Sequence, residues 1–167
     1  ILISGNAVKT DWKTNVKSIL QTWYLGSEAG NAIASILSGE INPSGKLPFT
    51  FPESLTDNGA HYFGKLSYPG DGESQYYKED ILVGYRWHDT KNIKPSFSFG
   101  HGLSYTSFEL TDINSNKKNY STNETIKISC IVKNTGEFEG KEVVQVYIGK
   151  VKSKVNRAKK ELRGFKK

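Results

Sequence analysis

The sequence changes character near residue 105, and this change constrains the fold more than any other feature. Residues 1–104 mix helix-like and strand-like patterns with glycine turns, whereas the residues from 105 onward show strand patterns only. Alternating strands and helices favour a parallel α/β sheet, and a run of strands alone favours an antiparallel β-sandwich. We therefore predict an α/β portion over 1–104 followed by an all-β portion over 105–167.

Three segments of the first portion predict a strand–helix–strand unit. Residues 18–24 form an apolar run that ends just before a glycine, as a buried strand does. The next apolar residues recur every three to four positions and predict a helix, with Ser27 as its N-cap and Gly39 as a left-handed C-cap. Residues 47–52 contain two prolines, which restrict this segment to an edge strand.

Two shorter elements and a long loop complete the first portion. Residues 1–4 are expected to be a short strand, and Asp11 is expected to cap a short helix near Trp12–Lys17. Residues 53–80 show little periodicity and are rich in Gly, Asp, Ser and Tyr. We interpret them as a long surface loop, and loops of that length are often functional.

The second portion contains three clear strand patterns. They are Phe108–Ile113, Thr125–Lys133 and Glu142–Ile148, with a turn predicted at 134–136. Three or four strands are too few to close a sandwich, so we expect further strands after residue 167. Cys130 lies among β-branched residues and is predicted to be a buried structural thiol rather than a reactive one.

The end of the chain is strongly basic. Residues 150–167 carry nine Lys and Arg residues but only one acidic residue, Glu161, and the net charge of the chain is +6. Such a tail suggests either nucleic-acid binding or a solvated strand edge on which lysines block edge-to-edge pairing. We favour the strand edge and predict no nucleic-acid partner, because no aromatic residues alternate with the charges. No apolar run is long enough to span a membrane, so no membrane partner is predicted.

The carboxylates of the 53–80 loop are the first candidates for chemistry. Asp71, Glu73, Glu79 and Asp80 cluster around a tyrosine-rich stretch, where a carboxyl group with a raised pKa could act as an acid. Solvation of the loop is the interpretation that we prefer. The three histidines lack metal-ligand spacing, no phosphate-binding or nucleophile-elbow motif is present, and neither a cofactor nor a metal is predicted.

Aromatic residues are concentrated between residues 62 and 99. They are Tyr62, Phe63, Tyr68, Tyr76, Tyr77, Tyr85, Trp87, Phe97 and Phe99. Aromatic faces stack on the apolar faces of sugars, and loops are the usual place for such contacts. We predict that Tyr68, Tyr76 and Tyr77 are substrate-binding candidates, and that the last four rings of the series join the two portions of the chain.

Several longer motifs resemble those of family-3 glycoside hydrolases of the β-glucosidase type, in the same order. They are residues 23–32 (WYLGSEAGNA), 42–48 (NPSGKLP) followed by Thr50-Phe51-Pro52, 83–87 (VGYRW) with Asp89, 99–106 (FGHGLSYT) with Phe108, 134–136 (NTG), 140–147 (GKEVVQVY) and 160–165 (KELRGF). Leu25 departs from the family pattern, which has proline there, and residues 150–159 are lysine-rich where relatives often have prolines.

The resemblance implies a parent enzyme of three parts. These are a barrel with a nucleophilic Asp, an α/β sandwich that usually supplies an acid/base Glu, and a fibronectin-III-like sandwich. This chain would be the C-terminal portion of the α/β sandwich with a linker (1–104) and most of the fibronectin-III-like domain, truncated at its C-terminus (105–167). Both catalytic carboxylates would lie outside it, so we assign no catalytic residue.

The implied partners are a missing N-terminal barrel and a carbohydrate substrate, namely a β-glucoside or an oligosaccharide with a terminal β-linked glucosyl residue. Two alternatives remain open at this stage. The parent could be a β-xylosidase of the same family, or the chain could be a stand-alone carbohydrate-binding or adhesion module.

Overall fold

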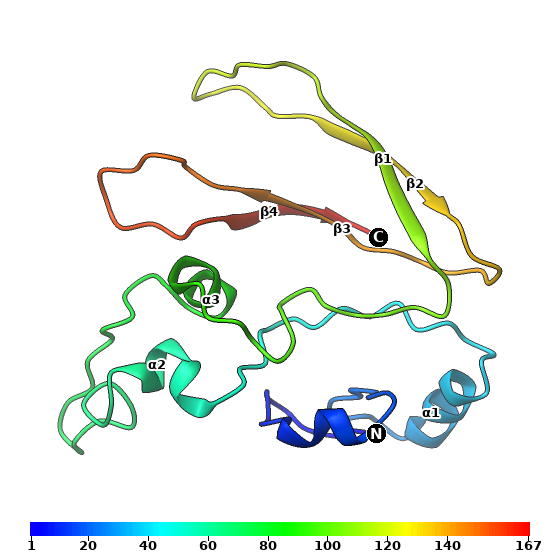
Figure 1. Ribbon diagram of the computed structural model, residues 1–167, viewed down its shortest axis with the longest axis horizontal. Helices are drawn as coiled ribbons and strands as arrows, with labels where there is room; N and C mark the ends of the chain where they lie inside the picture. The colour runs from blue at the N-terminus through cyan, green and yellow to red at the C-terminus, as the bar shows by residue number, and fades with distance from the viewer.

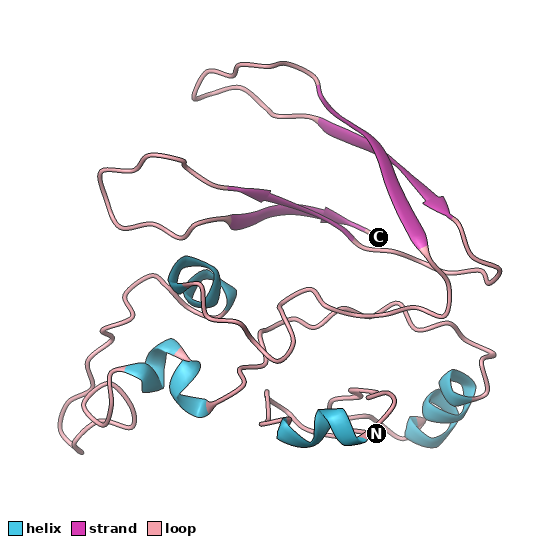
Figure 2. Cartoon of the chain, in the orientation of Figure 1, coloured by secondary structure: helices cyan, strands magenta, loops and turns pink.

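The computed structural model describes residues 1–167 and separates the helices from the strands along the chain (Figures 1 and 2). The elements in order are η1 (Asp11–Asn15), α1 (Ala29–Leu37), η2 (Leu55–Asp57), α2 (Gly59–Tyr62), α3 (Tyr85–Lys91), β1 (Phe108–Ser115), β2 (Ile128–Asn134), β3 (Val144–Ile148) and β4 (Glu161–Lys166). All helices precede all named strands, so the predicted change of fold class near residue 105 is confirmed.

The first residues of the chain pair in parallel with the segment before α1. Leu2 and Gln21 form a parallel bridge, in which Leu2 N donates to Leu20 O at 2.8 Å and Thr22 N donates to Leu2 O at 3.0 Å. The two predicted strands therefore lie side by side in the expected parallel direction. Their pairing is limited to this one bridge.

The helix caps were only partly predicted. Gly39 has a φ of +81° and donates to Ile36 O at 3.1 Å, which confirms the left-handed end of α1. The N-cap is Glu28 rather than Ser27, and it makes no side-chain cap hydrogen bond. The predicted cap at Asp11 is also wrong, because Asp11 begins η1 itself and its carboxylate pairs with Lys9 at 2.9 Å.

The proline-containing segment 47–52 pairs antiparallel with residues 96–101. Leu47 N donates to His101 O and Phe51 N donates to Phe97 O, both at 2.8 Å. Phe51 is almost fully buried, and its ring lies 6.2 Å from that of Phe97. The segment has one neighbour, as an edge does, but the predicted parallel unit with residues 18–24 is wrong, because the partner is the antiparallel segment 96–101. The regular pairing is a single bridge between Phe51 and Phe97.

Helix α3 was not predicted from the sequence. It has only seven residues, too few for a hydrophobic period to stand out. It begins after Gly84, whose φ is +59°, and ends at Asn92 in the left-handed conformation. Trp87 is 1% exposed, so burial of this side chain holds the helix in place. The loop 53–80 also differs from expectation because it contains η2 and α2.

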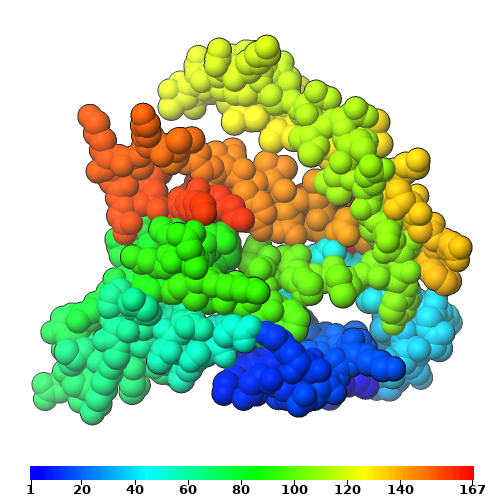
Figure 3. All heavy atoms as spheres, in the orientation of Figure 1, coloured from blue at the N-terminus to red at the C-terminus, as the bar shows by residue number.

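The four strands form two separate antiparallel ribbons rather than one sheet. β1 pairs with β2 and β3 with β4, and each ladder contains one shift of register. The β1–β2 ribbon arches over an open gap above the β3–β4 ribbon (Figure 3). Cys130, in β2, is only half-buried, so the burial predicted for this thiol is wrong. It lies in a ribbon that has no second layer against it.

The basic end of the chain is mostly a loop and not a strand edge. Six of its cations lie in the connection 149–160 between β3 and β4, and β4 itself was not predicted as a separate strand. The interpretation as a strand edge is therefore wrong for most of these lysines, because the residues that carry them form no ladder.

The α/β portion is fastened to the β portion through Asn42 and Lys46. The Asn42 side chain donates to Glu139 O and accepts from Ser104 Oγ and from Tyr105 N, each at 2.9 Å. Lys46 Nζ donates to the carbonyl of Gly102 at 2.6 Å and pairs with Glu142 at 2.8 Å. We call these contacts the Asn42–Lys46 clamp.

The glycine at 102 permits this clamp to close. A Cβ atom at Gly102 would overlap the carbonyl oxygen of Gly45, so two glycine-bearing motifs meet backbone to backbone. The chain as a whole buries little, since only 11 of its 167 residues are buried. Hydrogen bonds and close backbone contacts therefore carry much of the connection between the two portions.

We expect Gly102→Ala to lower the free energy of unfolding by about 1–3 kcal/mol, since the added methyl group must push Gly45 away. Gly30→Ala is the matched control, because Gly30 lies in α1 with open space at its Cβ position. The control is expected to be neutral or stabilising by up to about 1 kcal/mol. Urea unfolding of both variants measures the difference, and equal stabilities would contradict this account.

Candidate functional site

The candidate site is the aromatic loop 61–80, which projects beside α2 and α3 (Figure 1). The rings of Tyr62 and Phe63 lie 5.2 and 5.6 Å from the ring of Trp87. Trp87 Nε1 donates to Asp57 O at 3.0 Å. The buried indole therefore anchors both ends of α2 and holds the base of the loop against α3.

A buried serine joins the two arms of the loop. Ser67 is 1% exposed, and its hydroxyl lies within hydrogen-bonding distance of Tyr76 O, at 2.9 Å, and of Glu79 Oε2, at 3.4 Å. Tyr76 N donates to Leu66 O at 3.1 Å. These contacts close the loop on itself, so the segment between them is held at both ends.

The three tyrosines proposed as sugar contacts lie on the outside of this closed loop. Tyr68, Tyr76 and Tyr77 are 49%, 53% and 72% exposed, and their hydroxyl groups make no hydrogen bond within the chain. The ring of His61 lies 4.7 Å from that of Tyr68. Tyr76 and Tyr77 are neighbours in the sequence and lie on one arm of the closed loop. Tyr68 lies on the other arm, next to the contacts that join the two arms.

The loop carboxylates do not form a catalytic pair. Asp71 Oδ1 accepts from Ser74 N at 2.7 Å and from Glu73 N at 3.0 Å, and these hydrogen bonds hold the pKa of Asp71 below its ordinary value. This is the opposite of the raised pKa that an acid catalyst needs. Glu79 is buried against Ser67, and Asp80 accepts from Asn156 Nδ2 at 3.1 Å.

The expectation that the later aromatic rings join the two portions is correct for Tyr85, on which Phe99 stacks. Their rings stack at 4.8 Å, the Tyr85 ring lies 5.8 Å from Tyr147 of β3, and the Tyr85 hydroxyl accepts from Leu162 N at 2.8 Å. Burial, with smaller contributions from Tyr85 and Asp89, raises the pKa of Tyr147. These contacts seat β3 and β4 on α3.

Of the other two rings, Trp87 joins the two portions and Phe97 does not. Trp87 shares a buried cluster with Ala158 from the basic connection, but its aromatic neighbours are Tyr62 and Phe63 of the loop. Phe97 lies against Phe51 and 5.5 Å from His101, entirely within the first portion. The sequence showed the aromatic enrichment, but the partners of each ring depend on the tertiary fold.

The chain shows no obvious metal centre or membrane-spanning helix. No three or more His, Cys, Asp or Glu side chains come together as a possible metal site. None of the helices has the length and apolar character that crossing a bilayer requires. The site therefore consists of exposed aromatic rings on a closed loop.

The fold is an α/β portion fastened to two antiparallel ribbons, and models of two protein domains match these two portions. The model of the glycosyl hydrolase family 3 C-terminal domain matches residues 1–105, and that of the fibronectin type III-like domain matches residues 142–167. The chain belongs to glycoside hydrolase family 3.

Individual relatives agree with this family. The β-glucosidase BoGH3A of Bacteroides ovatus is 52% identical over 100% of this chain and 22% of its own length, and the thermostable β-glucosidase B of Acetivibrio thermocellus is 48% identical with the same coverage. The chain thus spans about a fifth of the length of the curated relatives it matches.

Solved structures agree as well. The structure of DesR, a β-glucosidase from Streptomyces venezuelae in complex with D-glucose, has a TM-score of 0.89 and 37% identity, covering 98% of this chain and 21% of DesR. β-Glucosidase 3B from Thermotoga neapolitana in complex with glucose has a TM-score of 0.87 and 41% identity, covering 98% of this chain and 22% of that enzyme. The backbone of almost the whole chain therefore has a close counterpart within these longer chains.

The low pKa of Asp71 leads to a test of the loop geometry. The chemical shift of the Ser74 amide proton should titrate with a midpoint below the ordinary Asp value of about 3.9, because the ionised carboxylate is the better acceptor. The turn is thus supported at neutral pH and weakens as pH falls through the lowered pKa. Asp71→Asn keeps an acceptor oxygen and should abolish this titration. A wild-type midpoint at or above 3.9 would contradict the assigned hydrogen bonds.

Proposed function

We propose that this chain is the C-terminal part of a retaining β-glucosidase that hydrolyses terminal non-reducing β-D-glucosyl residues. Residues 1–104 would be the end of its α/β sandwich with the linker, and 105–167 would belong to its fibronectin-III-like domain. The observation that carries the proposal is the match of the whole chain, at 52% identity, to a protein described as a β-glucosidase. The D-glucose present in the structure of DesR supports the same class of sugar.

The catalytic carboxylates are assigned to other parts of the parent enzyme. A retaining mechanism needs two carboxyl groups about 5–5.5 Å apart, one as nucleophile and one as acid and base. The best-placed carboxylates of this chain are engaged elsewhere, since Asp71 binds turn amides and Glu79 faces Ser67. The missing barrel domain and the earlier part of the α/β sandwich would supply the pair.

The role of this chain would be to form one wall of the substrate cleft through the loop 61–80. Tyr68, Tyr76 and Tyr77 expose ring faces that suit the apolar faces of a glucosyl unit or an oligosaccharide. Trp87 and Ser67 hold the loop closed, so binding a sugar would cost little ordering of the backbone.

A second candidate is a stand-alone carbohydrate-binding module, which the exposed tyrosines also support. A stand-alone module would bind an oligosaccharide in the absence of the barrel domain. A C-terminal part of a β-glucosidase would not bind it on its own. A β-xylosidase of the same family is the remaining alternative. The full-length protein would turn over an aryl β-glucoside faster than an aryl β-xyloside if it is a β-glucosidase, and the reverse if it is a β-xylosidase.

Purified residues 1–167 should hydrolyse no aryl β-glucoside, whereas the full-length protein should do so. Replacing Asp71, Glu73, Glu79 or Asp80 by Ala in the full-length protein should leave a substantial kcat, because none of them is assigned to the chemistry. Turnover by the isolated chain that disappears with one of these substitutions would overturn the proposal.

Tyr76→Ala and Tyr77→Ala in the full-length enzyme should each raise KM for a cello-oligosaccharide about fivefold with little change in kcat. The reason is that a stacking ring contributes about 1 kcal/mol of binding to ground state and transition state alike. Phe138→Ala is the matched control, since Phe138 is 59% exposed but lies in the β2–β3 turn. Unchanged KM values in both tyrosine variants would remove the loop from the cleft.

A further inference from the structure

The connection between β3 and β4 is unusually basic. Residues 149–160, which we call the basic loop, carry six cations and no acidic residue. The cations are Lys150, Lys152, Lys154, Arg157, Lys159 and Lys160. This concentration of like charge raises the local electrostatic potential and favours an anionic partner.

Only two of these cations are used within the chain. Lys160 pairs with Asp89 at 3.3 Å and lies over the ring of Tyr147, and Lys159 Nζ donates to Asn92 Oδ1 at 3.3 Å. The other four form no ion pair, side-chain hydrogen bond or cation–π contact. Val151, between two of them, is 97% exposed, so this part of the loop stands in solvent.

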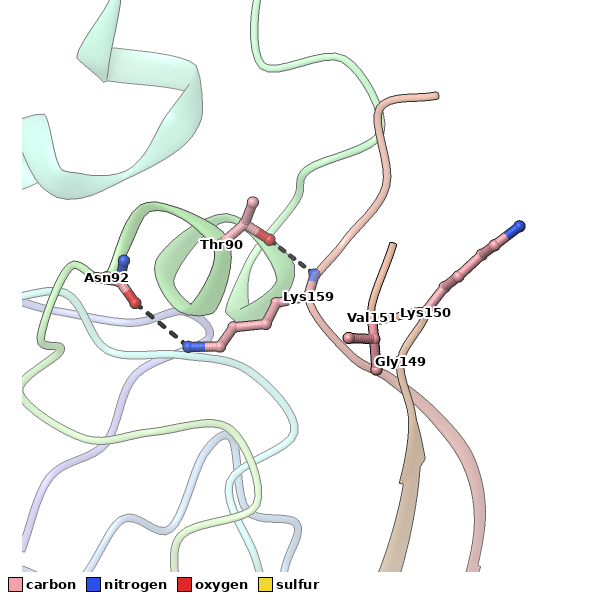
Figure 4. A pocket seen from close by; sticks show the side chains of 6 residues that line it. All are labelled: Thr90, Asn92, Gly149, Lys150, Val151 and Lys159. Atoms are coloured by element: carbon pink, nitrogen blue, oxygen red, sulfur yellow. Dashed lines mark hydrogen bonds between the residues drawn. The ribbon is translucent and has the colours of Figure 1, made fainter. Parts of the chain in front are cut away.

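A hollow of about 550 Å³ lies where the basic loop meets the end of α3 (Figure 4). Thr90, Asn92, Gly149, Lys150, Val151 and Lys159 line it. Two hydrogen bonds set its shape, since Lys159 N donates to Thr90 Oγ1 at 3.0 Å and Lys159 Nζ donates to Asn92 Oδ1. A Cβ at Gly149 would overlap the carbonyl oxygen of Lys159, so the two ends of the loop are in close contact.

The unused hydrogen-bonding capacity of the lining side chains consists mostly of donors. Asn92 uses its oxygen as an acceptor, which leaves its NH₂ group free, and the hydroxyl of Thr90 accepts and can still donate. Lys150 and Lys159 border the hollow, but their side chains run in opposite directions, that of Lys159 to Asn92 and that of Lys150 out into solvent (Figure 4). No carboxylate lines the hollow. Such a set of donors matches the oxygens of a carboxylate or a sulfate ester.

We propose that the basic loop and this hollow bind an anionic polysaccharide. One charged sugar residue would lie in the hollow beside the donors of Thr90 and Asn92, and the neighbouring charged residues would lie along the solvent-facing Lys150, Lys152, Lys154 and Arg157. The hollow is more open than enclosed, so a sugar residue would rest in it with one face in solvent.

Other polyanions fit these observations less well. Single-stranded nucleic acid is usually bound on aromatic platforms, and residues 149–160 contain no aromatic side chain. A lipid surface needs no hollow, and only Val151 and Val155 of the loop could enter the interface. The site does not depend on the proposed cleft wall, because none of Tyr68, Tyr76 and Tyr77 lines it.

The test is a calorimetric titration of the natural full-length protein with polygalacturonate and with a sulfated dextran, at low and at physiological salt. Lys150→Gln combined with Lys152→Gln should weaken binding at least about tenfold, because two charge-assisted contacts are lost. Lys118→Gln combined with Lys133→Gln is the charge-matched control, since both lysines are exposed in the β1–β2 ribbon and lack ion pairs. Melting temperatures of all variants verify that each is folded.

Tighter binding of either anionic glycan than of neutral dextran, lost in the first double variant and kept in the second, would support the site. Preference for polygalacturonate assigns a carboxylate ligand, and preference for sulfated dextran assigns a sulfate ester. Equal weakening in both double variants would mean that binding depends only on the net charge of the protein, and this would overturn the proposal. It would equally be overturned by tighter binding to anionic vesicles or single-stranded DNA, or by no binding to either glycan at low salt.

Discussion

The Asn42–Lys46 clamp is the interaction on which the rest of the structure depends. Lys46 and Glu142 are 14% and 20% exposed, so their ion pair is largely removed from water, and Lys46 also binds the Gly102 carbonyl. Loss of either partner would leave a charge with poor solvation, which is far costlier than loss of an exposed pair. The clamp positions the beginning of β3, and β3 in turn places β4 and the basic loop against α3.

Helix α3 is the second fixed point, and it serves both surfaces to which we assign a role. Its Trp87 supports the aromatic loop 61–80 on one side, while Tyr85 holds β3 and β4 through Tyr147 and Leu162. The end of the same helix forms one side of the hollow at the basic loop. A seven-residue helix can do this because burial of a large indole, rather than helix propensity, stabilises it.

Most of the architecture could be predicted where the signal is local. The change from mixed elements to strands, the end of α1 at Gly39, and three of the four strands follow from periodicity and turn residues. The N-cap of α1 was predicted one residue too early. The Asp11 cap was predicted wrongly because the Asp11 carboxylate pairs with Lys9 instead. The enrichment of tyrosines in the loop was visible, but its closure by Ser67 was not.

By itself, the sequence determined the order of the two portions, the glycines that allow backbones to meet, and the charge of residues 149–160, because these depend on residue type and spacing along the chain. Only the tertiary structure decided that Gly102 meets Gly45, that Asp71 binds turn amides and is held ionised, and that the cations form a loop beside α3. The physical reason is range. Backbone preference and periodicity act over a few residues, whereas close contacts, burial and electrostatic fields join groups that are tens of residues apart.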